Sequence, residues 1–353
     1  STAAANFAEA LEVRRKLASF DPDDLVTQQS LAHTCLRLAD LLTYSARTDQ
    51  AKELLYEALS IIDHNLEITA NDYRHLTDSV YACERLGNLM LSEGKLDEAE
   101  RLYGRILEAS QQALDLAPND SQVLRGVAIA HYRLGTLRQA EGKLTEARQE
   151  FERAVAIRRQ RFSQDPNDTE AENDVADALT FLGDVLWDLK QIDEAEQCYQ
   201  EKYEINNRIA ERDPTNAFAQ RALGIALGRL GKTAEGRGDF SQAIAHRRAV
   251  LKITHELLDA GDELTIYQTD LASSHHAVGV CLVRIGDVAG SIEHFQQALE
   301  ARMKLAEANP HNVIQQEDVV TALRNLGLSN RKLYRFDVAA EKYEQAAALA
   351  AEL

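Results

Sequence analysis

Residues 134–166 read LGTLRQAEGKLTEARQEFERAVAIRRQRFSQDP and carry the signals that decide the fold. A Leu-Gly pair opens this stretch, a second glycine follows at 142, and a proline closes it at 166. The same pair position recurs every 48 residues as Leu38-Ala39, Leu86-Gly87, Leu134-Gly135, Leu182-Gly183, Leu230-Gly231, Val278-Gly279 and Leu326-Gly327. The five prolines, at positions 22, 118, 166, 214 and 310, obey the same spacing. A constant spacing of this kind indicates a repeat protein.

Each repeat contains signals for two helices. Glycines at 94, 142, 238 and 286 are expected to end the first helix in the left-handed conformation. N-cap residues for the second helix are then predicted at Asp49, Asp97, Thr145, Asp193, Ser241 and Asp337, with Glu100 and Glu196 at capping-box spacing. N-cap residues for the first helix are predicted after the proline position at Asp24, Asp72, Asp120, Asp168, Asn216 and Asn312. We expect helices of roughly 20 residues.

The composition also predicts an all-α protein. The 353 residues are 45% hydrophobic but only 6% aromatic, and apolar residues between the caps fall at helical intervals. One helix pair cannot bury its apolar faces alone, so the pairs are expected to stack. The sequence thus predicts one solenoid of antiparallel helix pairs over 1–353, with a half unit at 1–20 and seven units starting near 23, 71, 119, 167, 215, 263 and 311.

The repeat resembles the tetratricopeptide repeat over essentially the whole chain. Beside Leu-Gly, the resemblance rests on small residues twelve positions after the glycine: Ala51, Ala99, Ala147, Ala195, Ala243, Ser291 and Ala339. Aromatic residues stand sixteen positions after it, at Tyr103, Phe151, Tyr199, Phe295 and Tyr343. The period exceeds the family's roughly 34 residues by two insertions of about two helical turns. The resemblance implies a right-handed α-solenoid, and extended units of this style recur in large bacterial signalling proteins.

The charge and the cysteine content limit the partners and the compartment that we expect for this protein. The formal net charge is -18, and residues 1–100 carry 9 Lys/Arg against 18 Asp/Glu. An acidic surface repels phosphate backbones and anionic lipid, so we expect neither nucleic acid nor membrane as a partner. The acidic N-terminal half would instead attract a basic partner. Four well-separated cysteines give no metal or disulfide pattern, and the first residues lack signal-peptide order, which predicts a cytoplasmic protein.

Catalytic and cofactor motifs are weak. Residues 226–233, ALGRLGKT, fit a loose phosphate-loop pattern, but they fall inside a predicted helix, where backbone N–H groups are already used. His131 and His275 occupy a core position and are expected to be buried and hydrogen-bonded. The adjacent His275-His276 pair points in two directions on a helix and makes a poor chelate. We therefore predict no enzyme activity, no cofactor and no metal.

The resemblance implies that a protein or peptide binds in the concave groove lined by the first helix of each unit. The groove stripe is predicted ten and three residues before, and four residues after, each Leu-Gly glycine. From it we select the candidate binding residues Arg125, Tyr132, Trp187, Arg221, His276 and Arg324. We predict a central binding cluster formed by four of these residues: Trp187, which is the only tryptophan, Tyr132, Arg125 and Arg221.

Three functions follow as hypotheses. The first is a non-catalytic protein-interaction scaffold or sensor module within a larger signalling protein. The second is a regulatory domain that binds a small ligand or nucleotide. The third is an oligomerisation module that stacks through its ends, because neither end carries a polar capping helix. From the same feature we expect that the sequence is a segment of a longer chain, or that its ends contact another domain or a second copy.

Overall fold

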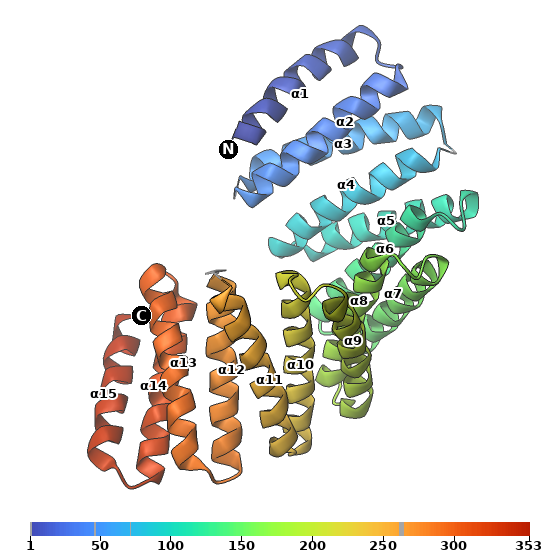
Figure 1. Ribbon diagram of the computed structural model, residues 1–353. Coiled ribbons are helices and arrows are strands. Elements are labelled where there is room, and N and C mark those ends of the chain that lie inside the picture. The colour runs from blue at the N-terminus through green and yellow to red at the C-terminus, as the bar shows by residue number, and fades with distance from the viewer. Residues whose placement is uncertain (1, 46, 71, 261–264) are drawn as a thin grey trace. The chain divides into compact units, whose positions relative to one another are not determined.

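The computed structural model describes residues 2–45, 47–70, 72–260 and 265–353, and every regular element in these ranges is an α-helix (Figure 1). The first helices of the repeats are α2 (Leu25–Tyr44), α4 (Tyr73–Ser92), α6 (Ser121–Ala140), α8 (Thr169–Asp188), α10 (Ala217–Arg237), α12 (Thr265–Arg284) and α14 (Val313–Lys332). The second helices are α1 (Thr2–Phe20), α3 (Thr48–Ile68), α5 (Leu96–Leu116), α7 (Leu144–Gln164), α9 (Ile192–Arg212), α11 (Phe240–Asp259), α13 (Val288–Ala308) and α15 (Phe336–Glu352). The starts of the first helices are 48 residues apart.

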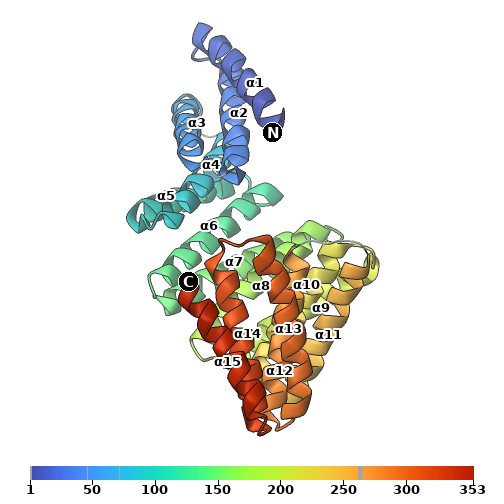
Figure 2. The same cartoon turned by 90° about the vertical axis from the view of Figure 1, so that its left-hand side faces the viewer.

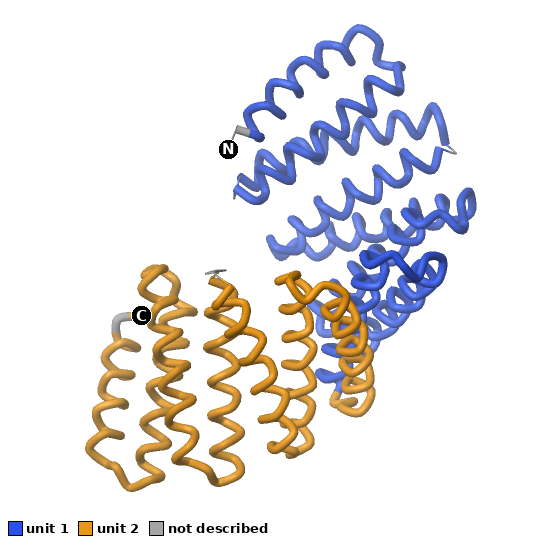
Figure 3. The backbone as a smooth tube through the Cα atoms, in the orientation of Figure 1, with its two compact units in different colours: residues 1–189 blue, residues 190–353 orange. Residues whose placement is uncertain are grey.

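The helices form two compact units, residues 1–189 with α1–α8 and residues 190–353 with α9–α15 (Figure 3). Within each unit every helix packs against the next one in the chain (Figure 2). Successive first helices also meet, as α4 does with α6. This stacking of consecutive helix pairs is the all-α solenoid architecture that the repeat predicts, while the extension of one solenoid over 1–353 stays a prediction.

The predicted caps of the first helices are confirmed. The Asp120 carboxylate accepts hydrogen bonds from the backbone N–H groups of Gln122 at 2.8 Å and Val123 at 3.1 Å. Equivalent side-chain caps begin α2, α4, α8, α10 and α14, at Asp24, Asp72, Asp168, Asn216 and Asn312. Each cap satisfies N–H groups that would lack an intrahelical partner.

The predicted caps of the second helices are wrong. These helices begin two residues earlier than expected, so Asp97 lies in the first turn of α5 and its N-cap is Lys95, without a side-chain cap bond. The predicted residues Asp49, Thr145, Asp193, Ser241 and Asp337 likewise lie inside their helices, and Glu100 and Glu196 complete no capping box. Side-chain caps occur instead at Asp239 and Asp287.

The tight turn between the helices explains this difference. Gly94 is left-handed with φ 74°, and the N–H of Lys95 donates to the carbonyl of Met90 at 2.9 Å. These bonds form a Schellman turn, which satisfies the last carbonyls of α4. One residue after the glycine is then enough to start α5. Lys190 and Tyr334 adopt the same left-handed conformation without being glycine, at φ 64° and 61°.

The Leu-Gly glycine allows the paired helices to approach closely. A Cβ added to Gly135 would stand 2.7 Å from Cε1 of Phe151, and one added to Gly279 would stand 2.6 Å from Cε1 of Phe295. The aromatic ring of the second helix therefore packs directly on the backbone of the first helix. Gly231, within residues 226–233, holds the same place inside α10, and the hydroxyl of the nearby Thr233 donates to the carbonyl of Leu230 at 2.8 Å. This helix leaves no phosphate loop at residues 226–233.

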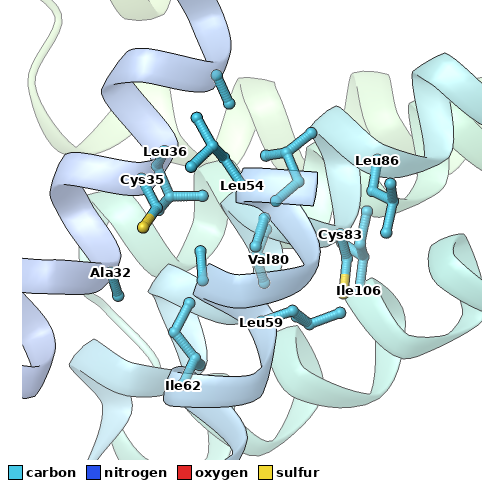
Figure 4. Packing of buried hydrophobic residues seen from close by; sticks show 14 of the residues in the cluster. Ala32, Cys35, Leu36, Leu54, Leu59, Ile62, Val80, Cys83, Leu86 and Ile106 are labelled. Atoms are coloured by element: carbon cyan, nitrogen blue, oxygen red, sulfur yellow. The ribbon is translucent and has the colours of Figure 1, made fainter. Parts of the chain in front are cut away.

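The core of unit 1 is built from small and aliphatic side chains between the two helix layers (Figure 4). Cys35, Cys83 and Leu86 are fully buried there, and Tyr103 fills the aromatic position. Burial of a leucine-sized side chain contributes roughly 1.5–3 kcal/mol. Because these residues recur with the repeat, each helix pair continues the core of the pair before it.

Candidate functional site

The face formed by the first helices carries polar contacts between successive repeats. Residues at the predicted groove positions pair with residues 49 positions later, one place beyond the equivalent position in the next repeat. The pairs are Gln29 with Asp78, Glu84 with Arg133, Arg125 with Asp174, Gln139 with Asp188, Arg221 with Asp270, and His276 with Asn325. The groove residues therefore also join neighbouring helices, which fixes their side chains on the first-helix face.

Unit 1 has a hollow of about 350 Å³ on this face, called here the arginine–tyrosine hollow. It is lined from α4, α6, α7 and α8, and its charged and aromatic lining comprises Tyr81, Glu84, Arg85, Arg125, Tyr132, Arg133, Arg158 and Asp174. Four arginines thus face two carboxylates in a chain of net charge -18. The hollow is locally basic.

Tyr132 lies at the centre of an aromatic and cationic cluster. Its ring centroid is 4.5 Å from that of Phe181 and 6.2 Å from that of Phe151. The guanidinium carbon of Arg133 lies 4.7 Å from the Tyr132 centroid, and that of Arg158 lies 5.9 Å from it. The ring is therefore held rigidly, and its hydroxyl makes no hydrogen bond within the described part of the chain.

The charged groups of the hollow are partly desolvated. Arg158 donates from Nη1 to the carbonyl of Asp174 at 2.6 Å, and burial lowers the pKa of this guanidinium. Burial also raises the pKa of the Asp174 carboxyl above its ordinary value, although neighbouring arginines oppose the shift. Arg125 is more accessible, with a side chain 42% exposed and Nη1 3.0 Å from the carboxylate of Glu170. Charges in such a setting interact more strongly than in bulk water.

The structure brings two of the six candidate residues, Arg125 and Tyr132, into one hollow. Trp187 is half-buried in the last turn of α8 and lies outside that lining. Arg221 belongs to unit 2, where Nε donates to Asp270 at 2.8 Å. The predicted cluster of four residues is thus divided between the two units.

The other two candidates also lie in unit 2. His276 on α12 is half-buried, 5.8 Å from the ring of Phe295, and burial with a nearby arginine lowers its pKa to about 4. Arg324 is exposed on α14. His276 packs on Phe295 while staying partly exposed, and Arg324 is accessible, so contact of these two residues with a partner stays a prediction.

The two histidines at the core position are hydrogen-bonded as predicted, but only His275 is buried, whereas His131 is half-buried. Nδ1 of His131 lies 2.7 Å from the carboxylate of Glu150, and Nδ1 of the buried His275 lies 3.0 Å from Nδ1 of His294. Both rings pair with the second helix of their own repeat. Among the described residues no group of three or more His, Cys, Asp or Glu side chains is arranged to hold a metal ion.

Several lining residues were missed by sequence reasoning. Arg158 comes from a second helix, which the groove prediction left out, yet Arg14 and Arg302 occupy the same repeat position and make the same contact to a backbone carbonyl. An alignment of the second helices by repeat would have indicated this position. Arg133 and Asp174 lie one place beyond the predicted stripe, because neighbouring first helices pair with a one-residue offset.

Comparison with known families supports the repeat assignment. Tetratricopeptide repeat profiles match residues 82–117, 128–161 and 174–249. No curated protein matches the sequence. No helix in the described residues has both the length and the apolar character needed to cross a membrane.

Solved structures share the architecture at low sequence identity. The apo form of RapI is 13% identical with a TM-score of 0.62, covering 92% of this chain and 77% of that one. BtubC from P. vanneervenii is 18% identical with a TM-score of 0.51, covering 86% and 90%. Yeast Tom70 is 14% identical with a TM-score of 0.50, covering 98% of this chain and 56% of Tom70. These likenesses concern the fold alone.

The fold and the first-helix face define an all-α solenoid of stacked helix pairs, an architecture that is typically non-catalytic and that supports protein-interaction scaffolds. Residues 82–117, 128–161 and 174–249 match the family models, so the chain contains tetratricopeptide repeats in these segments.

Proposed function

We propose that this chain is a protein-interaction scaffold or sensor module that binds a protein or peptide segment on its first-helix face. The arginine–tyrosine hollow of unit 1 is the principal contact in this proposal. The observation that carries it is the gathering of four arginines and two tyrosines around one hollow. Arginine and tyrosine are enriched among the residues that dominate binding energy at protein interfaces.

The chemistry of the hollow favours an acidic segment. Its lining has two more arginines than carboxylates, and the partly buried guanidinium of Arg158 is poorly solvated. A carboxylate from a partner would form charge-assisted hydrogen bonds with these arginines, and such bonds are stronger than neutral ones. The accessible Arg125 and the free hydroxyl of Tyr132 are the side chains best placed to receive it.

The acidic composition of residues 1–100 favours a different partner on the remaining surface of unit 1. A basic segment would be attracted to that surface through long-range charge, and it would not need the hollow. The two partners are distinguishable, because only an acidic segment depends on Arg125 and Tyr132.

The wider setting rests on sequence alone. A place within a larger signalling protein, contacts with other domains or a second copy through the ends, and a cytoplasmic location remain predictions. The four free cysteines support a reducing compartment.

The test is capture of partners on the immobilised chain, followed by measurement of their affinity for variants. An Arg125→Ala, Tyr132→Phe double variant keeps the ring packed against Phe181, and we expect it to weaken binding by about tenfold or more. Arg101→Ala removes one exposed arginine from a second helix and serves as the matched control. Partners that bind the double variant and the parent chain equally would exclude the hollow as the principal contact.

A further inference from the structure

Unit 2 has its own hollow on the first-helix face, between α10 and α12 and over α11. Its volume is about 220 Å³. The charged lining is Arg221, Arg229, Lys232, Arg247 and Asp270, and Glu235 pairs with Arg247 beside it. Positively charged side chains outnumber the carboxylates among these residues.

The repeat changes at this hollow in two ways at once. Arg247 occupies the position sixteen residues after the Leu-Gly glycine, where the other repeats have Leu55, Tyr103, Phe151, Tyr199, Phe295 and Tyr343. The first helix of the same repeat has glycine at 224 and 228, where the flanking repeats carry larger residues. Glycine weakens a helix relative to alanine, so two extra glycines in α10 are unfavourable for folding alone.

The geometry connects these two changes. Nε and Nη2 of Arg247 both donate to one oxygen of Glu235, at 3.3 and 3.2 Å. Its Nη1 lies 3.5 Å from the place where a Cβ at residue 228 would stand. Within the described residues, Nη1 makes no hydrogen bond. The missing side chain at 228 therefore opens a path by which this edge of the guanidinium reaches the hollow.

Two further side chains add hydrogen-bond donors. Arg221 uses Nε and Nη2 on Asp270, at 2.8 and 3.4 Å, which leaves its Nη1 without a bond in the described part of the chain. Ser274 on α12 lines the hollow and is only 4% exposed, and its hydroxyl likewise makes no hydrogen bond among the described residues. A partly buried donor without a partner costs free energy, and an acceptor that binds to it recovers that cost.

We propose that this hollow is a binding site for a compact polyvalent anion, held by Arg247 and Arg221 with Ser274 as an added donor. The ligand class is a small phosphate-bearing or polycarboxylate compound. Planar guanidinium groups suit both, because they bind phosphate and carboxylate oxygens in pairs. The volume is below the roughly 300–1,000 Å³ typical of sites for larger ligands, which disfavours a whole nucleotide.

The experiment is calorimetric titration of the intact chain with pyrophosphate and, separately, with citrate, at an ionic strength held constant with KCl. We expect at least one of the two anions to bind saturably with one site per chain, and the anion that binds identifies the ligand chemistry. Arg247→Gln should weaken this binding by at least about tenfold, because it removes a charged hydrogen bond. Arg248→Gln removes the adjacent exposed arginine and should leave binding unchanged.

A second variant tests the location without touching a charged group. Gly224 has only Ile253 and Val250 near its missing Cβ, at 3.9 and 4.0 Å, so Gly224→Leu should fold, strengthen α10 and fill the hollow. Loss of anion binding in Gly224→Leu, with a melting temperature no lower than that of the parent chain, supports the site. Absence of saturable binding by either anion, or full binding by a folded Gly224→Leu variant, would overturn the proposal.

Discussion

Gly135 and Gly104 are both helical glycines, but only Gly135 faces a side chain. A Cβ at Gly135 would stand 2.7 Å from the Phe151 ring, whereas nothing lies within 4 Å of a Cβ at Gly104. We expect Gly135→Ala to destabilise the protein, because overpacking costs about 1–3 kcal/mol and outweighs the gain in helix propensity. Gly104→Ala should instead stabilise it by up to about 1 kcal/mol. Urea unfolding of both variants provides the measurement, and changes of the same sign would contradict the close approach of α6 and α7.

The histidine pair His275 and His294 makes stability depend on pH. His275 is buried, and among the residues that the structure describes the charged or titratable groups acting on its ring are His294, with Nδ1 at 3.0 Å, and His255, with a centroid distance of 6.2 Å. Burial lowers the pKa of His275 to about 4, and burial also lowers that of His294. The folded state therefore favours neutral rings. The contribution of His275 to the free energy of unfolding is fully present above the unfolded-state pKa of about 6.5 and is lost as pH falls toward 4.

We predict that lowering the pH from 7 to 5 removes about 2 kcal/mol of unfolding free energy through His275. His275→Gln cannot titrate, so its stability should fall by that much less over the same interval. The difference between the two chains isolates His275 from other groups, including His276, whose pKa is also lowered to about 4. Equal pH dependence in both chains would show that His275 titrates normally.

For single residues, the position within the repeat predicted which side chains pack between the paired helices. His131 and His275 were expected to be buried and hydrogen-bonded because they share a core position; both are hydrogen-bonded, but only His275 is buried and His131 is half-buried. Arg247 was missed, although its departure from the aromatic position is visible in the sequence. The unused edge of its guanidinium was beyond prediction, because it depends on which of the Arg247 nitrogens donate to Glu235.

Two aspartates stabilise the starts of their helices in different ways. Asp120 caps α6 through two backbone N–H groups, whereas Asp97 lies in the first turn of α5. We expect Asp120→Ala to lower the unfolding free energy by about 1 kcal/mol, because it removes an N-cap. Asp97→Ala loses only a favourable interaction with the helix dipole, about 0.3–1 kcal/mol at low salt. Thermal unfolding in 0.5 M NaCl should separate the two, because salt screens only the second effect. Equal losses there would restore Asp97 as a cap.

The cap prediction succeeded for first helices and failed for second helices for one physical reason. Before α6 the chain needs a polar side chain to satisfy exposed N–H groups, and aspartate is a direct signal of that need. Before α5 the left-handed Gly94 and the Schellman turn set the helix start through backbone bonds, which leave no such signal. Acidic residues in the first turn, favoured by the helix dipole, were then mistaken for caps.

At the scale of the whole molecule, the 48-residue spacing predicted the number and order of the helices in the described chain. It did not predict the contacts between repeats, which join residues 49 positions apart on the first-helix face. That offset arises from how one helix pair packs on the next, and sequence spacing alone does not contain it. Arg125 and Tyr132 were therefore predicted, while their partners Asp174 and Arg133 were not.

Hydrogen–deuterium exchange of the chain with and without a captured partner tests the central claim, that the first-helix face of unit 1 binds protein. Exchange reports local opening, which a bound segment suppresses where it packs. We predict slower exchange, by about tenfold or more, in peptides from α4 and α6, with α3 and α5 unchanged. Protection confined to second helices, or absent from α4 and α6 at saturating partner, would exclude binding on the first-helix face.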